Sequence, residues 1–186
     1  MPLTPFHIAF AWLIKLKFRR LDFAALTAGS IVPDLEIPVF FAFGLGRDSL
    51  FAHSIVGALT VDIILSVLIV WILSKLRVNK IGLYGFGKAR LTKNFAVSAA
   101  IGSLTHVFSD LSNHYVNPVF WPYTAIPSSL VDSVGIVYAS LFIHSLALLI
   151  LAWIIKRELG KEGESMGYLL KHPLRAFAIT TKSLST

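Results

Sequence analysis

Two long apolar segments limit most strongly what this chain can fold into. Residues 51–74, FAHSIVGALTVDIILSVLIVWILS, and 130–155, LVDSVGIVYASLFIHSLALLILAWII, are almost entirely apolar. A helix needs roughly 20 such residues to cross a hydrocarbon core of about 30 Å, so each segment can span a bilayer. Segments 21–43 and 94–116 can also span, with polar interruptions, and 5–18 is a shorter apolar helix. We therefore predict an all-α, polytopic transmembrane bundle of about five helices.

The composition agrees with a membrane protein and argues against several other classes. Hydrophobic residues make up 55% of the 186, and 17 basic against 10 acidic residues give a net charge of +7. No basic stripe interleaved with aromatics points to a nucleic-acid partner. The absence of cysteine excludes disulfides, thiolate ligands and a cysteine nucleophile. We expect one transmembrane domain over residues 1–157, followed at 158–186 by a basic tail that is cytoplasmic, interfacial or without fixed structure.

Basic residues fall very unevenly on the two sides of such a bundle. If the N-terminus is outside and all five segments cross, every Lys and Arg except Arg47 lies on one side. They occupy the end of the first segment, the loop 75–93 and the chain after residue 155. Cytoplasmic loops carry an excess of Lys and Arg. We therefore predict a multi-pass protein of the cell (inner) membrane with a cytoplasmic C-terminus. If segment 5–18 does not cross, only the N-terminus changes side.

Ionisable side chains recur inside these apolar segments, although a charge at the bilayer centre costs roughly 2.5–3.5 kcal/mol on insertion. Such residues usually face the protein interior and mark function. Seven of them come from four segments yet lie at a similar depth near the outer face: His7, Asp34, Glu36, His53, His106, Asp110 and His114. The topology rests only on Lys and Arg, so this common depth is a partly independent observation.

The stretch GSLTHVFSDLSNHYVNP, residues 102–118, carries the most informative spacing. His106 and Asp110 are four residues apart and therefore share one face of a helix. His114 is a further turn along and reaches the same place only at the edge of that face or if the helix unwinds. In the second segment, Pro33 removes a backbone donor and bends the helix. This bend would turn the carboxylate of Asp34 into the bundle.

Imidazole and carboxylate ligands together suit zinc, and also manganese or iron(II). The histidines and carboxylates near the outer face are more than one tetrahedral metal shell needs, and they are enough for two ions about 3.5–4 Å apart. Such a pair of ions activates water and holds both oxygens of a phosphoester displacement. We predict one or two divalent ions, zinc in first place, bound by His7, Asp34, His53, His106, Asp110 and His114. Asp34 and Glu36 are the candidate catalytic residues, one of which accepts a proton.

The remaining polar residues have simpler interpretations. His144 has no acidic neighbour in sequence and is expected to hydrogen-bond within the bundle, and His172 in the tail is expected at the surface. Asp62 is expected to make a structural hydrogen bond or to support a ligand. For His106 and Asp110, the main competitor to metal binding is a buried proton relay.

Four motifs in order, TPFH, GSIVPDLE, AHSIVGALTVD and SLTHVFSDLSNH, resemble a family of small bacterial and archaeal integral membrane proteins of unknown function. That family is similar to the predicted inner-membrane metal-dependent hydrolases and, distantly, to the zinc-dependent phospholipase C superfamily. The resemblance covers about residues 1–123. It implies ligand roles for His7, Asp34, His53, His106 and Asp110, with His114 and Glu36 as further candidates. The chain departs from the phospholipase pattern at His144, where the expected Glu four residues later is Leu148.

The resulting expectation is a membrane-embedded metal-dependent hydrolase that acts on a phosphoester or related bond of a lipid or amphiphile by metal-activated water. Its partners would be the membrane and that substrate, without nucleic acid. The alternative is a membrane metal-binding, transport or proton-relay protein without hydrolase activity. A transporter needs polar groups that continue to the cytoplasmic side. The inner halves of 51–74 and 130–155 carry almost none, which favours a site on one side only.

Overall fold

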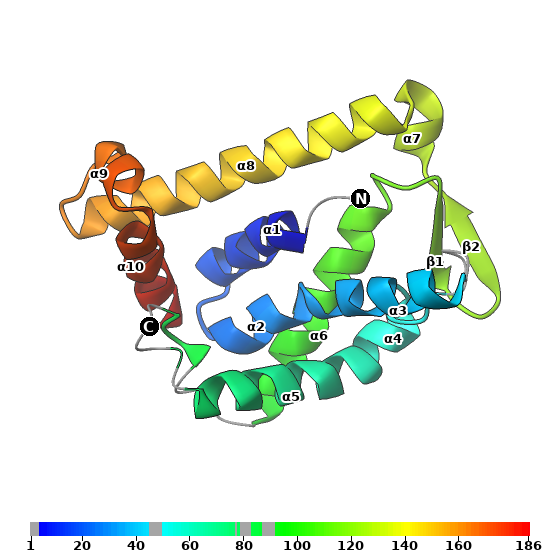
Figure 1. Ribbon diagram of the computed structural model, residues 1–186, viewed down its shortest axis with the longest axis horizontal. Helices are drawn as coiled ribbons and strands as arrows, with labels where there is room; N and C mark the ends of the chain where they lie inside the picture. Colours follow the sequence, from blue (N-terminus) through cyan, green and yellow to red (C-terminus); the bar gives the residue numbers. More distant parts are fainter. Residues whose placement is uncertain (1–3, 45–49, 77, 79–82, 87–91) are drawn as a thin grey trace.

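The computed structural model describes residues 4–44, 50–76, 78, 83–86 and 92–186, which form a mostly helical fold with one short hairpin (Figure 1). The prediction of a mainly helical fold is thereby confirmed, whereas the polytopic bundle stays a prediction. The helices are α1 (Thr4–Lys17), α2 (Phe23–Gly29), the 3-10 turn η1 (Val32–Leu35), α3 (Glu36–Phe43), α4 (Ile55–Leu59), α5 (Val61–Lys75), α6 (Lys93–Asp110), α7 (Ser129–Val134), α8 (Ile136–Lys161), α9 (Met166–Lys171) and α10 (Pro173–Ser185). The antiparallel strands are β1 (Val116–Phe120) and β2 (Thr124–Pro127), with Asn117 opposite Ile126.

The second apolar segment is broken near its middle, as Pro33 predicts. α2 ends at Gly29, Pro33 lies in η1, and α3 begins at Glu36. The two parts of the segment are bent by 44° relative to each other. Because proline has no N–H and its ring clashes with the preceding turn, the helix cannot continue straight through this point. Asp34 therefore lies on a tight turn, where its carboxylate leaves the line of α2.

The third apolar segment is also interrupted, which the sequence did not predict. α4 and α5 are separate helices that meet at Thr60, whose φ of −129° and ψ of −88° are not helical. The hydroxyl of Ser54 caps α4 by accepting the N–H of Gly57 at 3.0 Å. His53, which belongs to the segment 51–74 expected to span as a helix, lies in the turn before this cap.

The close crossing of α2 and α6 determines which polar groups of the two helices come together. A Cβ added at Gly29 would lie 2.2 Å from the carbonyl oxygen of Ala99, and one at Gly102 would lie 2.2 Å from that of Leu26. The two backbones therefore approach as closely as helices do at small-residue contacts in membranes. This approach brings Ser30, just after α2, against the face of α6 that carries His106.

The chain after residue 157 is folded onto the bundle. α10 buries Ala176, Thr180, Thr181 and Leu184, and Leu184 belongs to the same apolar core as Trp12 of α1. The side chain of Glu158 on α8 is buried and accepts a hydrogen bond from Ser183 of α10. These contacts give the tail two ordered helices, so a tail without fixed structure is not what the chain forms. The domain boundary at residue 157 stays a prediction.

The elements are arranged between two distinct ends of the molecule (Figure 1). The C-terminal ends of α1, α5 and α8 gather at one end with α9 and α10, and α3, α4, α7 and the hairpin lie towards the other. Within the described residues, one helix, α8, is long and apolar enough to cross a membrane, and the bent pair of α2 with η1 and α3 passes the same test together. Arg47, Arg77, Lys80, Lys88 and Arg90 of the predicted topology lie outside the described residues.

Candidate functional site

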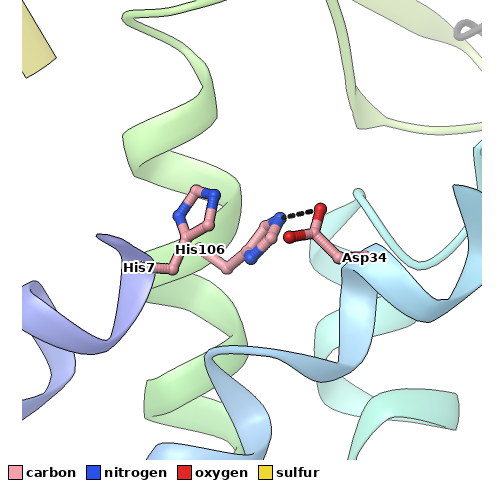
Figure 2. A group of neighbouring side chains, drawn as sticks. All are labelled: His7, Asp34 and His106. Carbon is pink, nitrogen blue, oxygen red and sulfur yellow. Dashed lines mark ion pairs between the residues drawn. The ribbon is translucent and has the colours of Figure 1, made fainter. Parts of the chain in front are cut away.

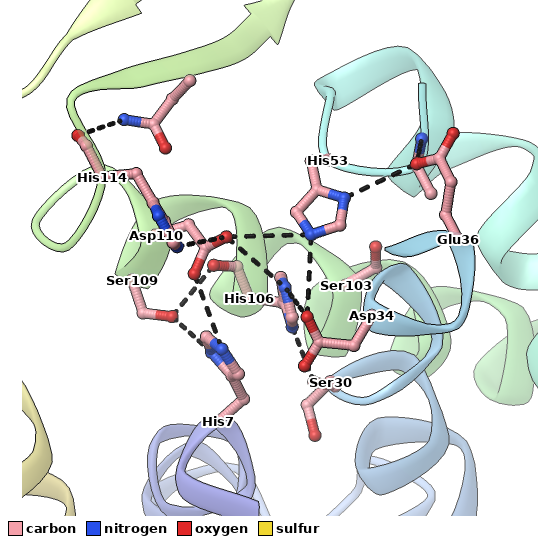
Figure 3. A network of polar contacts seen from close by, with 12 residues as sticks. His7, Ser30, Asp34, Glu36, His53, Ser103, His106, Ser109, Asp110 and His114 are labelled. Atoms are coloured by element: carbon pink, nitrogen blue, oxygen red, sulfur yellow. Dashed lines mark hydrogen bonds and ion pairs between the residues drawn. The ribbon is translucent and has the colours of Figure 1, made fainter. Parts of the chain in front are cut away.

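Six predicted ligands from four parts of the chain converge on one buried polar centre (Figure 3). His7 comes from α1, Asp34 from η1, and His53 from the turn before α4. The other three are His106 and Asp110 on α6 and His114 just after it. All four imidazoles and the carboxylate of Asp110 are buried, and Asp34 is half-buried. Residues that are distant in sequence therefore form a single group in space.

Asp110 lies at the middle of this group, at the last turn of α6. Its Oδ1 is 3.5 Å from Nε2 of His7. Its Oδ2 is 3.8 Å from Nε2 of His53, 3.7 Å from that of His106 and 3.5 Å from that of His114. The carboxylate thus presents one oxygen to His7 of α1 and the other to three histidines. The predicted unwinding after α6 is what allows His114 to return to it.

Asp34 closes the side of the centre opposite α1 (Figure 2). Its Oδ1 is 3.5 Å from Nε2 of His106 and 3.7 Å from Nε2 of His53. Two overlapping triads result, His7–Asp34–His106 and His53–His106–Asp110, in which one ligand atom per residue lies within 4.8 Å of the others. Each triad could hold a metal ion, and the two share His106.

A backbone carbonyl determines which nitrogen of His106 carries its proton. Nδ1 of His106 lies 3.0 Å from the carbonyl oxygen of Ser30. A carbonyl can only accept, so Nδ1 donates and carries the hydrogen. In the neutral ring, Nε2 then has a free lone pair, and this lone pair faces the carboxylates of Asp34 and Asp110. Nε2 makes no hydrogen bond to the described residues.

Ser109 determines the proton position of His7 in the same way. The Ser109 hydroxyl donates its single hydrogen to the carbonyl oxygen of His106 at 2.9 Å. Its contact of 2.7 Å with Nδ1 of His7 must therefore be one in which the imidazole donates. Nε2 of His7 is left with the lone pair, directed towards Asp110, and it too makes no hydrogen bond to the described residues.

Glu36 lies outside the group of six ligands and contacts the turn that carries one of them, His53. Its two carboxylate oxygens accept the backbone N–H groups of Phe51 at 2.9 Å and Ala52 at 2.8 Å. Oε2 also lies 3.5 Å from Nδ1 of His53, the ring nitrogen that faces away from Asp34 and Asp110. Figure 3 shows Glu36 on the far side of the His53 ring from the other ligands. Glu36 therefore holds the turn that carries His53, and orients its imidazole.

The other polar residues singled out in the sequence lie elsewhere. The buried carboxylate of Asp62 on α5 accepts a hydrogen bond from Ser103 of α6, as expected of a structural partner. Nδ1 of His144 lies 2.6 Å from the carbonyl oxygen of Ser140 in its own helix, and the ring packs edge-on against Phe6. His172 is exposed in the tail, as predicted.

The sequence did not single out the residues that orient these ligands. The carbonyl of Ser30 and the hydroxyl of Ser109 each fix one imidazole, and Asn117 donates to the carbonyl oxygen of His114 at 3.2 Å. For Ser109, the local sequence could have predicted part of this. It stands three residues after His106, and a serine in a helix can donate to a carbonyl oxygen of the preceding turn. Nothing in the local pattern marks the Ser30 carbonyl, because its partner is on another helix.

Comparison with known proteins places the chain in a family without assigning an activity. The chain belongs to the family described as a domain of unknown function (DUF4184), whose model matches residues 1–179. No curated protein and no solved structure matches the chain. The predicted membership of an uncharacterised family is thus confirmed. The similarity to metal-dependent hydrolases finds no support among named relatives, and any activity is argued below from the geometry.

Proposed function

We propose that this protein is a multi-pass membrane hydrolase that binds one or two divalent metal ions, zinc in first place, and cleaves a phosphoester or related bond of a lipid or amphiphile. One observation carries the metal site. The Nε2 lone pairs of His7 and His106 are both directed at carboxylates, and a lone pair facing an anion is repelled. A cation between them removes this conflict and becomes the common partner of both.

The distances agree with a coordination shell. Ligand atoms about 2.1 Å from a tetrahedral zinc ion lie about 3.4 Å from one another. The separations between imidazole nitrogens and carboxylate oxygens in the centre are 3.5 to 3.8 Å. Metal-bound histidines usually donate a hydrogen bond from the ring nitrogen that does not bind the metal. Nδ1 of His7 and Nδ1 of His106 make such bonds.

A proton relay is the competing function for the same residues. It would require direct bonds from protonated imidazoles to the carboxylates, and such charge-assisted bonds are about 2.7–2.9 Å long. The separation of His7 from Asp110 is 3.5 Å, as is that of His106 from Asp34. These gaps suit an ion between the groups better than a proton.

Transport is the second competitor, and the polar residues beyond the centre bear on it. Asp62 and Ser66 of α5 and Ser103 of α6 are buried and continue the polar line away from the ligands. The next buried residue on α5 is Val70, in the apolar core. Along α5 the buried side chains therefore change from polar to apolar, which favours a site open to one side over a pathway along this helix.

The surface supports placement of the whole bundle in a bilayer. Apolar side chains are exposed along α8 from Val137 to Trp153 and along α5 from Val61 to Ile72. Soluble monomers rarely expose continuous apolar patches of this kind. The ends of α1, α5 and α8 that carry the basic residues lie together in Figure 1, which fits a cytoplasmic face there. The site would then be nearer the outer face.

The residues have separate roles in the proposed reaction. A bound divalent ion supplies Lewis acidity, which activates water and stabilises the charge on the phosphoester. His7, Asp34, His53, His106, Asp110 and His114 would hold it. Asp34, half-buried and on a turn, is placed to accept the proton of the attacking water. Glu36 is engaged with two backbone N–H groups and acts by orienting His53.

The test is the metal content of the detergent-purified full chain, measured by mass spectrometry. We expect one or two equivalents of zinc, manganese or iron in the wild type. The double variant His106→Ala/Asp110→Ala should lose them, and the control His172→Ala, which changes an exposed histidine, should keep them. Hydrolysis of phosphatidylcholine vesicles and of bis(p-nitrophenyl) phosphate is then measured for each form. A folded wild type that takes up no added metal would overturn the proposal, and so would a metal-free variant that retains wild-type turnover.

A further inference from the structure

An apolar cavity of about 210 Å³ lies between α1, α2, α5 and α10. Its lining includes Ile8 and Trp12 of α1, Ala28 of α2, Ile69 of α5 and Phe177 of α10. The polar groups of its wall are already bonded: the indole N–H of Trp12 donates to the Thr27 hydroxyl at 3.1 Å, and the Thr181 hydroxyl donates to the carbonyl oxygen of Ala178 at 3.1 Å. The wall therefore offers a polar ligand little to bind.

The cavity is lined by residues that lie close in sequence to two of the proposed ligands, and it extends towards the basic end of the molecule. On α1, Ile8 directly follows His7, and Trp12 is a turn further along. On the second segment, Ala28 and Ile31 line the cavity just before the turn that carries Asp34. Phe177 closes it from α10, which lies at the basic end in Figure 1.

This position defines the occupant chemically. Apolar cavities of about 150 Å³ stay dry and take up hydrocarbon such as benzene. A lipid of the outer leaflet has its phosphoester at the outer face and its chains directed towards the bilayer centre. In the proposed orientation, the metal centre would lie nearer the outer face and the cavity nearer the bilayer centre, which is the order of phosphoester and chain in such a lipid.

We propose that the cavity binds one hydrocarbon chain of a phospholipid whose phosphoester lies at the His/Asp centre. This inference rests on the proposed function for the headgroup end, but chain binding itself needs neither metal nor turnover. It makes the substrate a lipid recognised by its chain as well as by its phosphate.

Quenching of Trp12 by brominated lipid tests the occupant directly. Trp71, Trp121 and Trp153 are replaced by Phe in the full chain, which leaves Trp12 as the only tryptophan, and the protein is placed in phosphatidylcholine vesicles with brominated chains. Trp12 is 1% exposed, so lipid around the protein does not touch it. We expect its emission to be quenched nonetheless, and Ala28→Phe, which fills the cavity, to return it to the level seen in unbrominated vesicles.

A matched control keeps Trp153 as the only tryptophan, which is 51% exposed on α8 and should be quenched with or without Ala28→Phe. Ala28→Leu fills less space, should relieve quenching in part, and replaces Ala28→Phe if that variant does not fold.

Absence of Trp12 quenching in the folded protein would overturn the proposal, as would quenching that the filled cavity does not alter. If quenching holds but no phosphoester is cleaved, the proposed reaction is wrong and the chain site stands. If bis(p-nitrophenyl) phosphate is cleaved without quenching, the chain site alone is wrong.

Discussion

The imidazole rings of His7 and His106 stack on each other, with centroids 3.8 Å apart and planes inclined by 26°. Two stacked imidazolium cations would repel each other strongly in a buried site, so the pair is stable when the rings are neutral. Metal binding requires the same neutral form. The stack, the Ser30 carbonyl and the Ser109 hydroxyl thus all favour rings whose Nε2 lone pairs face the carboxylates.

Loss of the Ser109 hydroxyl should weaken metal binding without unfolding the protein. Ser109→Ala removes the acceptor that holds Nδ1–H of His7, so the ring can rotate or change tautomer. Removal of such an outer partner typically costs 10- to 100-fold in metal affinity, and we expect roughly this loss. Competition with a zinc chelator measures it. The control Ser133→Ala removes an exposed serine of α7, and its affinity should equal that of the wild type. Equal affinities of Ser109→Ala and the wild type would refute the role.

Replacement of Glu36 by Gln separates an orienting role from a catalytic one. Gln replaces one of the two carboxylate oxygens by an NH2 donor, which would face the N–H of Phe51 or Ala52, so the turn that carries His53 should loosen. We expect zinc affinity to fall by about 10- to 100-fold, and turnover to recover at saturating zinc. The exposed Glu162→Gln serves as the control. Unchanged affinity with turnover that zinc does not restore would make Glu36 the proton acceptor instead.

The close crossing of α2 and α6 should tolerate no side chain. In Gly102→Ala the new methyl would meet the Leu26 carbonyl oxygen, a backbone atom that cannot rotate away. Overpacking of this kind costs about 1–3 kcal/mol, and we expect that loss in the free energy of unfolding. Denaturant unfolding in detergent measures it. The control Gly160→Ala on α8 meets no atom within 4 Å and should be neutral or stabilising. Equal stability of the two variants would show that the helices do not cross as described.

The predicted topology can be tested with single cysteines because the chain has none of its own. Tyr123→Cys lies in the hairpin, where the side chain is 91% exposed, and Arg175→Cys lies on α10 at the basic end. In intact cells, a membrane-impermeant maleimide should label the first and not the second. After permeabilisation it should label both. Labelling of Arg175→Cys from outside would invert or abolish the proposed orientation.

Much of the candidate site follows from local sequence rules. His106 and Asp110 share a face because a helix turns by a fixed angle per residue, and Pro33 breaks the second segment because proline lacks an N–H. The sequence failed where partners come from distant segments. The break at Thr60, the turn that carries His53 and the hairpin of β1 and β2 follow no strong local signal. The bonds of Glu36 to Phe51 and Ala52 could not be predicted from its place beside Asp34, because both partners lie in another segment.

By itself, the sequence determined the helical class, the uneven distribution of charge and the set of ionisable side chains inside apolar segments. These depend on composition and on spacing within one element, where geometry is fixed by the backbone. Only the tertiary structure decided which ring nitrogens face Asp110, because that depends on the Ser30 carbonyl and the Ser109 hydroxyl, brought in by helix packing at Gly29 and Gly102. It also decided that α10 closes an apolar cavity between α1, α2 and α5. Contacts between elements arise from the shape of their packed surfaces, which local spacing does not encode.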